Sequence, residues 1–101
     1  MEEKLKRIIN HYGVIPQLKY LQSEVFELNE AIIDYEVTKV PIDKVMEVHK
    51  EKVKHITEEI ADVMVMLEQF KLYYEITDEK VKNVMNQKID RQIERIVNEN
   101  N

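Results

Sequence analysis

The segment from Asp43 to Tyr74 contains neither glycine nor proline, and it limits the possible folds of this chain more than any other feature. Apolar residues recur along it at spacings of three and four, the pattern of one buried helical face. The residues in this register are Met46, His49, Val53, Ile56, Ile60, Val63, Leu67, Phe70 and Tyr74. The pattern predicts either one long helix or a short helix that leads into a longer one near His49.

Turn-forming residues are scarce throughout the chain, which has one glycine and two prolines in 101 residues. This composition predicts few, long helices, and a chain of this length predicts one domain over residues 1–101. The expected elements are a helix at 2–11, a break from Tyr12 to Pro16, a helix from Pro16 to Tyr35, a connection from Val37 to Ile42, a helix capped by Asp43, a last helix capped by Thr77, and a polar tail at about 98–101. Together they predict an all-α fold.

The second half of the long helix is apolar on nearly all sides. Between Ile60 and Tyr74, Val65 and Leu72 lie opposite the main stripe. A helix with this pattern is usually buried on more than one side, and in a chain this small we expect the second side to be a subunit interface. The sequence therefore predicts a homodimer or a homotetramer.

Two pairs of acidic residues lie beside the apolar stripes of the predicted helices. Glu59 lies roughly 80° from the centre of its stripe, and Asp62 follows one turn later. Glu24 lies roughly 70° from the apolar ladder of the preceding helix, and Glu27 follows it in the same way. A carboxylate at the edge of a core is costly unless a cation or a hydrogen-bond donor meets it. Both pairs therefore need an explanation, either a bound cation or contact with solvent.

If the two helices pack against each other, these four acids surround one point. Converging carboxylate oxygens are suitable ligands for Mg²⁺, or for Mn²⁺, bound together with phosphate oxygens. The alternative is that the acids are solvated flanks of amphipathic helices. Glu30 and Glu58 fit that alternative, because both point away from their apolar stripes.

Basic residues gather on one flank of the last predicted helix, at Lys88, Arg91 and Arg95. They form either a clamp for phosphate groups or an ordinary solvated surface. The chain has no P-loop and no G-x-G-x-x-G motif, so a bound phosphate would be held by metal and side chains. Glu51 and His55 are spaced as an i, i+4 pair that could hold zinc, but two ligands are a weak signal.

Composition and charge argue against several classes of function. The chain has no cysteine, so it has no disulfide framework and no thiolate metal site. Its net charge of −5 at pH 7 argues against binding to a nucleic acid polymer. No apolar run reaches the ~20 residues of a membrane span, and the first residues do not resemble a signal peptide. We expect a cytoplasmic protein without a membrane partner.

Three motifs resemble those of one enzyme family. The sequence EVFEL-x-x-AI at residues 24–32 and EEIADV at residues 58–63 resemble the E-x-x-E and E-x-x-D motifs of MazG-like nucleoside triphosphate pyrophosphohydrolases. The sequence NQKIDR at residues 86–91 resembles the N-x-K-x-x-R run of the same family. These enzymes belong to the all-α NTP pyrophosphatase superfamily, with the dimeric dUTPases and dCTP pyrophosphatases. The likeness covers roughly residues 12–96.

The resemblance implies a four-helix bundle that assembles into a dimer or tetramer and hydrolyses an NTP or dNTP to the monophosphate and pyrophosphate with Mg²⁺. It implies that the metal ligands and catalytic residues are Glu24, Glu27, Glu59 and Asp62, and that the phosphates are faced by Lys88 and Arg91. One of the carboxylates is expected to act as the general base for an attacking water, and the sequence leaves open which one. It also leaves open the preferred base and sugar.

The chain departs from the family pattern at two places. Residues 28–58 separate the two acid pairs, and this connection of 31 residues is longer than usual, which suggests an extra turn or small helix. Ser23 stands where an acid is frequent, which suggests fewer or weaker metal ions. Two other interpretations stay open: a non-catalytic helical interaction protein, and an inactive relative that senses nucleotides.

Overall fold

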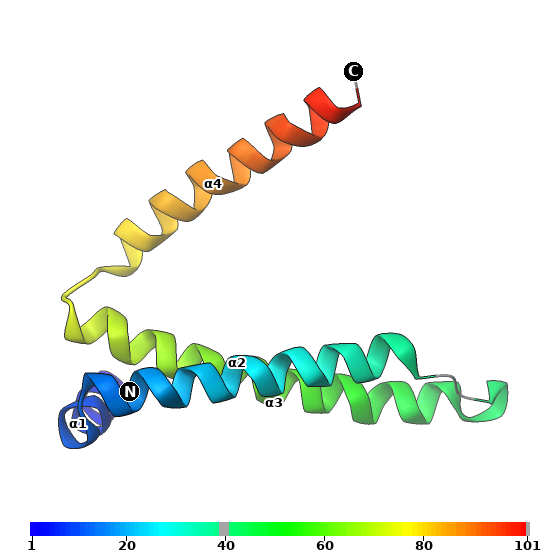
Figure 1. The fold of residues 1–101 in the computed structure, drawn as a ribbon, viewed down its shortest axis with the longest axis horizontal. Coiled ribbons are helices and arrows are strands. Elements are labelled where there is room, and N and C mark those ends of the chain that lie inside the picture. Colours follow the sequence, from blue (N-terminus) through cyan, green and yellow to red (C-terminus); the bar gives the residue numbers. More distant parts are fainter. Residues whose placement is uncertain (39–40, 101) are drawn as a thin grey trace.

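The computed structural model describes residues 1–38 and 41–100, which form α-helices joined by short connections (Figure 1). The helices are α1 (Glu2–Tyr12), α2 (Val14–Val37), α3 (Val45–Tyr73) and α4 (Asp78–Glu99), with a 3₁₀ turn, η1 (Ile42–Lys44), before α3. No strand occurs within the described ranges, so the predicted all-α class is confirmed. α4 continues through Glu99, into the expected polar tail.

α3 is one continuous helix of 29 residues, which decides between the two arrangements predicted for this segment. Asp43, the expected N-cap, lies instead in η1, and α3 begins at Val45 without a side-chain cap. η1 forms part of the long connection between the two acid pairs, where the sequence suggested an extra turn. Lys39 and Val40 of the predicted connection lie outside the described residues.

Gly13 forms the corner between α1 and α2. Its φ of 89° lies in the left-handed region, which glycine adopts without steric cost. Its N–H donates to the carbonyl of Ile9 at 2.8 Å and ends α1, and its carbonyl accepts from the N–H of Gln17 in α2. Pro16 lies in this first turn, where a missing N–H leaves no helical bond unmade. The corner directs α1 across the end of α2.

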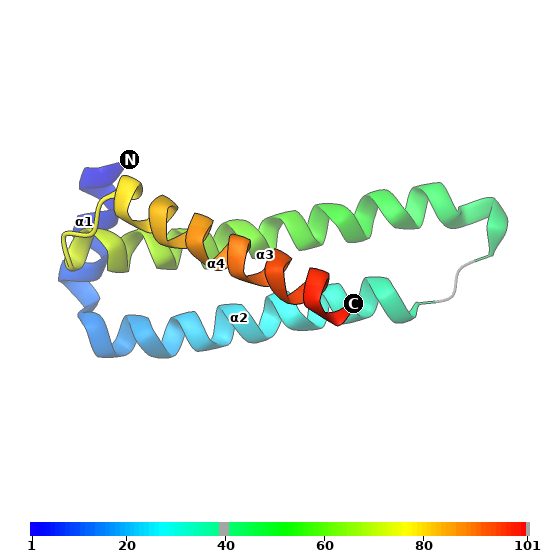
Figure 2. The ribbon, with the colours of Figure 1, turned by 90° about the horizontal axis from the view of Figure 1, so that it is seen from above.

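α2 and α3 lie side by side as an antiparallel pair, and α1 packs across one end of the pair, mainly on α3 (Figures 1 and 2). Ile9 of α1 is fully buried there. At the opposite end, the Tyr35 hydroxyl lies 2.7 Å from Nδ1 of His49, and the Lys52 ammonium pairs with Asp34. These contacts fix the register of α2 against α3 at both ends.

The contact line between α2 and α3 differs from the predicted apolar stripes. The buried positions on this line include Glu24 and Ala31 of α2 and Met66 and Gln69 of α3. The stripe residues Ile60 and Leu67, predicted to be buried, are 42% and 46% exposed. The corresponding residues of α2 are also more than 40% exposed, namely Leu18, Val25 and Ile32. The prediction placed the most apolar face inside the chain's own core, whereas the helices meet about one residue away from it.

The exposed residues form a continuous apolar face of the α2/α3 pair, which we call the apolar face; it consists of Leu18, Val25 and Ile32 of α2 with Val53, Ile60 and Leu67 of α3. Each of these six side chains is between 40% and 47% exposed. A contiguous exposed apolar patch is typical of a binding surface, so this face is a candidate for one.

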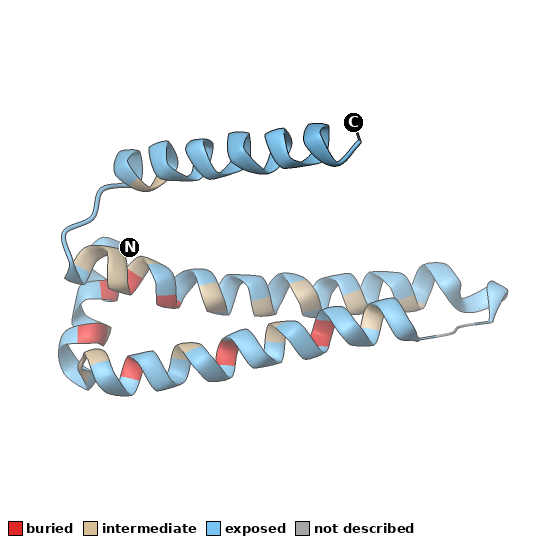
Figure 3. Ribbon diagram, turned by 45° about the horizontal axis from the view of Figure 1, so that its top comes forward, coloured by how far each residue is buried: buried red, intermediate tan, exposed pale blue. Residues whose placement is uncertain are grey.

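α4 extends away from the other helices and packs on none of them within the described residues (Figures 1 and 3). Its first turn is capped as predicted, since the N–H of Lys80 donates to the Thr77 hydroxyl at 3.2 Å. Its apolar ladder is half exposed, at 51–54%, along Met85, Ile89, Ile93 and Ile96. A single chain therefore packs three helices together, and the four-helix bundle stays a prediction for an assembly.

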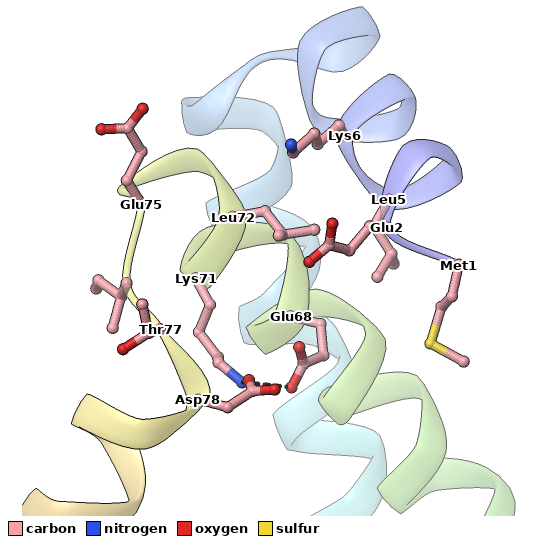
Figure 4. Close-up of a pocket in the computed structure, with 11 residues that line it drawn as sticks. Met1, Glu2, Leu5, Lys6, Glu68, Lys71, Leu72, Glu75, Thr77 and Asp78 are labelled. Atoms are coloured by element: carbon pink, nitrogen blue, oxygen red, sulfur yellow. Dashed lines mark hydrogen bonds and ion pairs between the residues drawn. The ribbon is translucent and has the colours of Figure 1, made fainter.

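Lys71 holds the corner between α3 and α4. Its ammonium donates to Glu68 at 2.8 Å and also pairs with Asp78 at the start of α4 (Figure 4). The bonds to Asp78 and then to Glu68 raise the pKa of Lys71. Glu75, in the connection, takes a φ of 56°, an uncommon value for a residue with a side chain. The direction of α4 therefore depends on this corner and not on packing against the α2/α3 pair.

Across the described ranges, none of the helices combines the length and the apolar character that crossing a bilayer requires.

Candidate metal site

Three of the four predicted metal ligands converge midway along the α2/α3 pair. Glu24 and Glu27 lie one turn apart on α2, and Glu59 faces them from α3. One carboxylate oxygen from each residue lies within 4.8 Å of the other two. Asp62 falls outside this group but lies next to it, since it lines a cavity together with Glu24. The antiparallel packing of two helices that each carry an acid pair brings these side chains together.

Two oxygens of this cluster are buried without a hydrogen-bond partner: Oε2 of Glu24 and Oε2 of Glu59. The Glu24 residue as a whole is only 6% exposed. A buried carboxylate oxygen without a donor carries a large desolvation cost. No lysine or arginine forms an ion pair with Glu24, Glu27 or Glu59 among the described residues. The negative charge of the cluster is therefore not offset by a lysine or arginine of the described residues.

Burial is the main cause of a raised pKa at Glu24, and the negative charges of Glu27 and Asp62 raise it further. The negative charge of Glu24 is in turn the main cause of a raised pKa at Tyr20, one turn before it on α2. The two shifts share one cause, the close approach of several carboxylates, to which burial adds at Glu24. A divalent cation would reverse both effects.

The cluster fits a divalent cation that prefers oxygen ligands. Mg²⁺ takes one to a few carboxylates at about 2.0–2.1 Å and keeps several positions for water or phosphate. Carboxylate oxygens within 4.8 Å of each other can all come to this metal–oxygen distance from one shared ion when the glutamate side chains rotate. Two unpartnered buried oxygens, one from each helix, are available for this purpose.

His55 was not connected with Glu59 by the sequence reasoning, which paired it with Glu51. In the structure, Nε2 of His55 lies 3.2 Å from Oε1 of Glu59. The signal in the sequence is the i, i+4 spacing of these two residues on α3. His55 therefore holds one Glu59 oxygen and leaves Oε2 free for another partner.

A cavity of about 530 Å³ adjoins the acid cluster, between α1, α2 and α3. Gln17 and Gln69 line it, and Nε2 of Gln17 donates to Oε1 of Gln69 at 2.8 Å. The sequence reasoning missed both glutamines. Their spacing from the acids could have revealed them. Gln17 lies two turns before Glu24 on α2, and Gln69 lies two turns after Asp62 on α3, so each glutamine is on the same side of its helix as an acid.

The basic residues predicted to face phosphate lie far from this arrangement. Lys88, Arg91 and Arg95 are all exposed on α4, which packs on no other helix in the described part of the chain. Within one chain, the structure does not bring them to the acid cluster. They reach a cluster only if α4 packs on an α2/α3 pair.

Comparisons of this chain with protein-family models, with curated proteins and with solved structures gave no match. The resemblance to MazG-like enzymes therefore rests on the three motifs alone and stays a prediction.

Proposed function

We propose that the protein is a cytoplasmic nucleoside triphosphate pyrophosphohydrolase that depends on Mg²⁺ or Mn²⁺ and converts an NTP or dNTP to the monophosphate and pyrophosphate. The observation that carries the proposal is the convergence of Glu24, Glu27 and Glu59, with two buried oxygens that have no partner. The motif resemblance supplies the reaction type. The adjoining cavity is of the size that takes a small molecule.

In this proposal, Glu24, Glu27 and Glu59 hold the cation. When bound, the cation offsets the negative charge of the triphosphate, which is about four units near neutral pH. Water attacks the α-phosphorus, the bond to the β-phosphate oxygen breaks, and pyrophosphate leaves with the electron pair. Asp62 is exposed and lies outside the group of three, so its carboxylate is free to accept the proton of the attacking water.

The enzyme is proposed to work as a homodimer or homotetramer in which four helices pack together. The single chain exposes 8662 Å², about 2,600 Å² more than the roughly 6,000 Å² of a compact monomer of this mass. Its radius of gyration is 17.8 Å, against about 13 Å for a compact chain of this length. An excess of this size matches an obligate interface. The second side of the long helix predicts an interface from Val65 to Tyr73, and these two residues are 43% and 49% exposed.

The direct test is a product assay over a panel of NTPs and dNTPs with Mg²⁺. Release of pyrophosphate and the monophosphate is expected, whereas release of orthophosphate would indicate a different phosphatase reaction. The reaction should stop in EDTA and in the Asp62→Asn and Glu59→Gln variants. Glu58→Gln, a change of the same kind at the exposed neighbouring residue, is the control and should retain activity.

A second candidate function is a non-catalytic helical interaction protein. The exposed apolar face and the half-exposed ladder of α4 favour it, since both are binding surfaces whether or not the acids bind metal. A nucleotide sensor without turnover is the intermediate case. Thermal melts separate the three: an adaptor ignores both Mg²⁺ and nucleotide, a sensor is stabilised without product, and the enzyme gives product.

A further inference from the structure

The cavity beside the acid cluster has features that a metal site alone does not need. It lies where α1 crosses the α2/α3 pair, and its volume of about 530 Å³ is within the range of pockets for small molecules. Glu24 and Asp62 form its border with the acid cluster, so a ligand that fills the cavity can extend to the metal. Apolar side chains such as Ile8 and Met66 form much of its wall.

Two buried amides stand in this apolar wall. Gln17 is 7% exposed and Gln69 is 1% exposed. Gln17 Nε2 donates to Gln69 Oε1 at 2.8 Å, whereas Gln69 Nε2 has only long contacts, 3.4 Å to the Val65 carbonyl and 3.7 Å to the Met66 sulfur. Gln17 makes no other side-chain hydrogen bond with the described residues, so its carbonyl oxygen and second N–H remain for a ligand.

The bond to Gln69 uses one N–H of the Gln17 amide, so the Gln17 carbonyl oxygen and second N–H remain as an acceptor and a donor on one planar group. Such a pair matches the hydrogen-bonding edge of a nucleobase, which also presents a donor next to an acceptor. The side chains of Tyr12 and Tyr20 line the same cavity, and aromatic rings provide stacking surfaces for bases.

We propose that this cavity binds the base of the nucleotide, with the Gln17 amide bonded to the hydrogen-bonding edge of the base and Gln69 as its positioning residue. The inference rests on the proposed function, since it gives the base a place while the phosphates extend past Glu24 to the acid cluster. The ligand class is a nucleoside with a free hydrogen-bonding edge. A bare polyphosphate does not fill the cavity.

An assembly through the apolar face leaves this cavity open, whereas an interface that reached Val65 would border it. α1, which closes one side of the cavity, lies below α3 in Figure 1, whereas α4 rises on the other side of the α2/α3 pair. The apolar face, where we expect another helix to pack, contributes none of the residues that line the cavity. An interface on the apolar face therefore does not fill the base site.

The test measures nucleoside binding without phosphate, so that it does not depend on hydrolysis. Uridine is titrated into the full chain in EDTA, and the side-chain amide resonances of Gln17 and Gln69 are followed by NMR. We expect both to shift on binding. 5-Methyluridine, which keeps the hydrogen-bonding edge, should bind like uridine, and N3-methyluridine, which blocks it, should bind at least tenfold more weakly.

Variants separate base recognition from folding. Gln17→Met should weaken uridine binding at least tenfold, because it removes the donor and acceptor at similar volume. The Gln17→Met/Gln69→Met variant removes both amides, so it leaves no buried polar group unpaired and keeps the fold testable. Gln22→Met, at an exposed position on the same helix, is the matched control and should bind as the wild type does.

The outcomes distinguish this inference from the proposed function. Pyrophosphate release without nucleoside binding, or equal binding of uridine and N3-methyluridine, overturns the base site and leaves the enzymatic proposal intact. Nucleoside binding without pyrophosphate release supports the base site and excludes the proposed hydrolase activity. Equal uridine binding by the control and both glutamine variants assigns the two amides to helix packing and overturns the inference.

Discussion

Glu24 on α2 and Glu59 on α3 each bury one carboxylate oxygen, Oε2, for which the described residues provide no hydrogen-bond partner. Both residues belong to the one group of three acids whose oxygens lie within 4.8 Å of each other in the described part of the chain. Two buried carboxylate oxygens without a donor at one contact between helices destabilise that contact, and a bound cation would offset this cost. The relationship between these two residues therefore links the stability of the α2/α3 pair to metal binding.

The first prediction concerns stability with and without metal. Glu24→Gln and Glu59→Gln each remove one of several crowded like charges, so in EDTA they should melt at the same temperature as the wild type or higher. Mg²⁺ at 100 times its Kd should stabilise the wild type by about 2.7 kcal/mol, and both variants should lose most of this gain. Thermal melts in EDTA and in Mg²⁺ measure both quantities.

Glu58→Gln is the control for these melts, because it changes the same charge at an exposed position next to Glu59. It should keep the full response to Mg²⁺. A variant of Glu24 or Glu59 that melts about 1–3 kcal/mol lower in EDTA, and still responds fully to Mg²⁺, would show that the residue is a structural acid bonded to a donor.

The second prediction is a pH dependence of the metal-free protein. Burial, with the charges of Glu27 and Asp62, raises the pKa of Glu24 above 4.5 in the folded state. The folded state then holds this proton more tightly than the unfolded chain does. The resulting stability is present below pH 4.5 and is lost as the pH rises through the raised pKa. Denaturant titrations in EDTA across this range should show the loss.

Glu24→Gln should flatten this part of the pH profile, because the variant has no proton to lose at that position. The bond from Lys52 is the main cause of a lowered pKa at Asp34, which acts at more acidic pH and in the opposite direction, so it does not mask the effect. With Mg²⁺, wild-type stability should instead rise with pH, since metal and proton compete for the same oxygens. Identical profiles for variant and wild type in EDTA would refute this account.

Much of this fold follows from local sequence signals. The only glycine gives the corner at Gly13, Thr77 caps α4, and the absence of breakers gives the continuous α3. These features depend on residues within one or two turns of each other, so periodicity and capping rules are sufficient to find them.

The contact line between α2 and α3 could not be found in this way. The apolar pattern marks which face of a helix is buried, but it does not tell whether another helix of the same chain or another copy buries it. The prediction assigned Ile60 and Leu67 to the chain's own core, and the structure leaves them half exposed. The convergence of Glu24, Glu27 and Glu59 was predicted from their offset beside the apolar stripes. The buried glutamines could not be predicted, because their burial depends on where the helices meet.

The third prediction concerns the basic flank of α4. If Lys88 and Arg91 face the phosphates, Lys88→Ala or Arg91→Ala should lower kcat/KM tenfold or more, since a charge-assisted bond contributes about 1.5–3 kcal/mol. Neither should change the melting temperature, because both side chains are exposed. Lys82→Ala, on the opposite side of the helix from Arg91, is the matched control. Unchanged kinetics in both variants would show that these two residues form an ordinary solvated surface and do not bind phosphate.

The last prediction concerns the assembly that covers α4. Its apolar ladder is about half exposed over the length of the helix, and the apolar face of the α2/α3 pair is exposed to a similar degree. If α4 packs on another copy, Ile89→Glu or Ile93→Glu places a charge in that interface and should give a monomer by light scattering at micromolar concentration. Gln87→Glu adds the same charge to α4 away from the ladder and should leave the oligomer intact.

The monomeric variants should also lose activity, because the cations of α4 then no longer reach an acid cluster. A wild-type chain with a monomer mass at this concentration would exclude the assembly. Dissociated variants with full activity would show that Lys88 and Arg91 are not needed at the acid cluster.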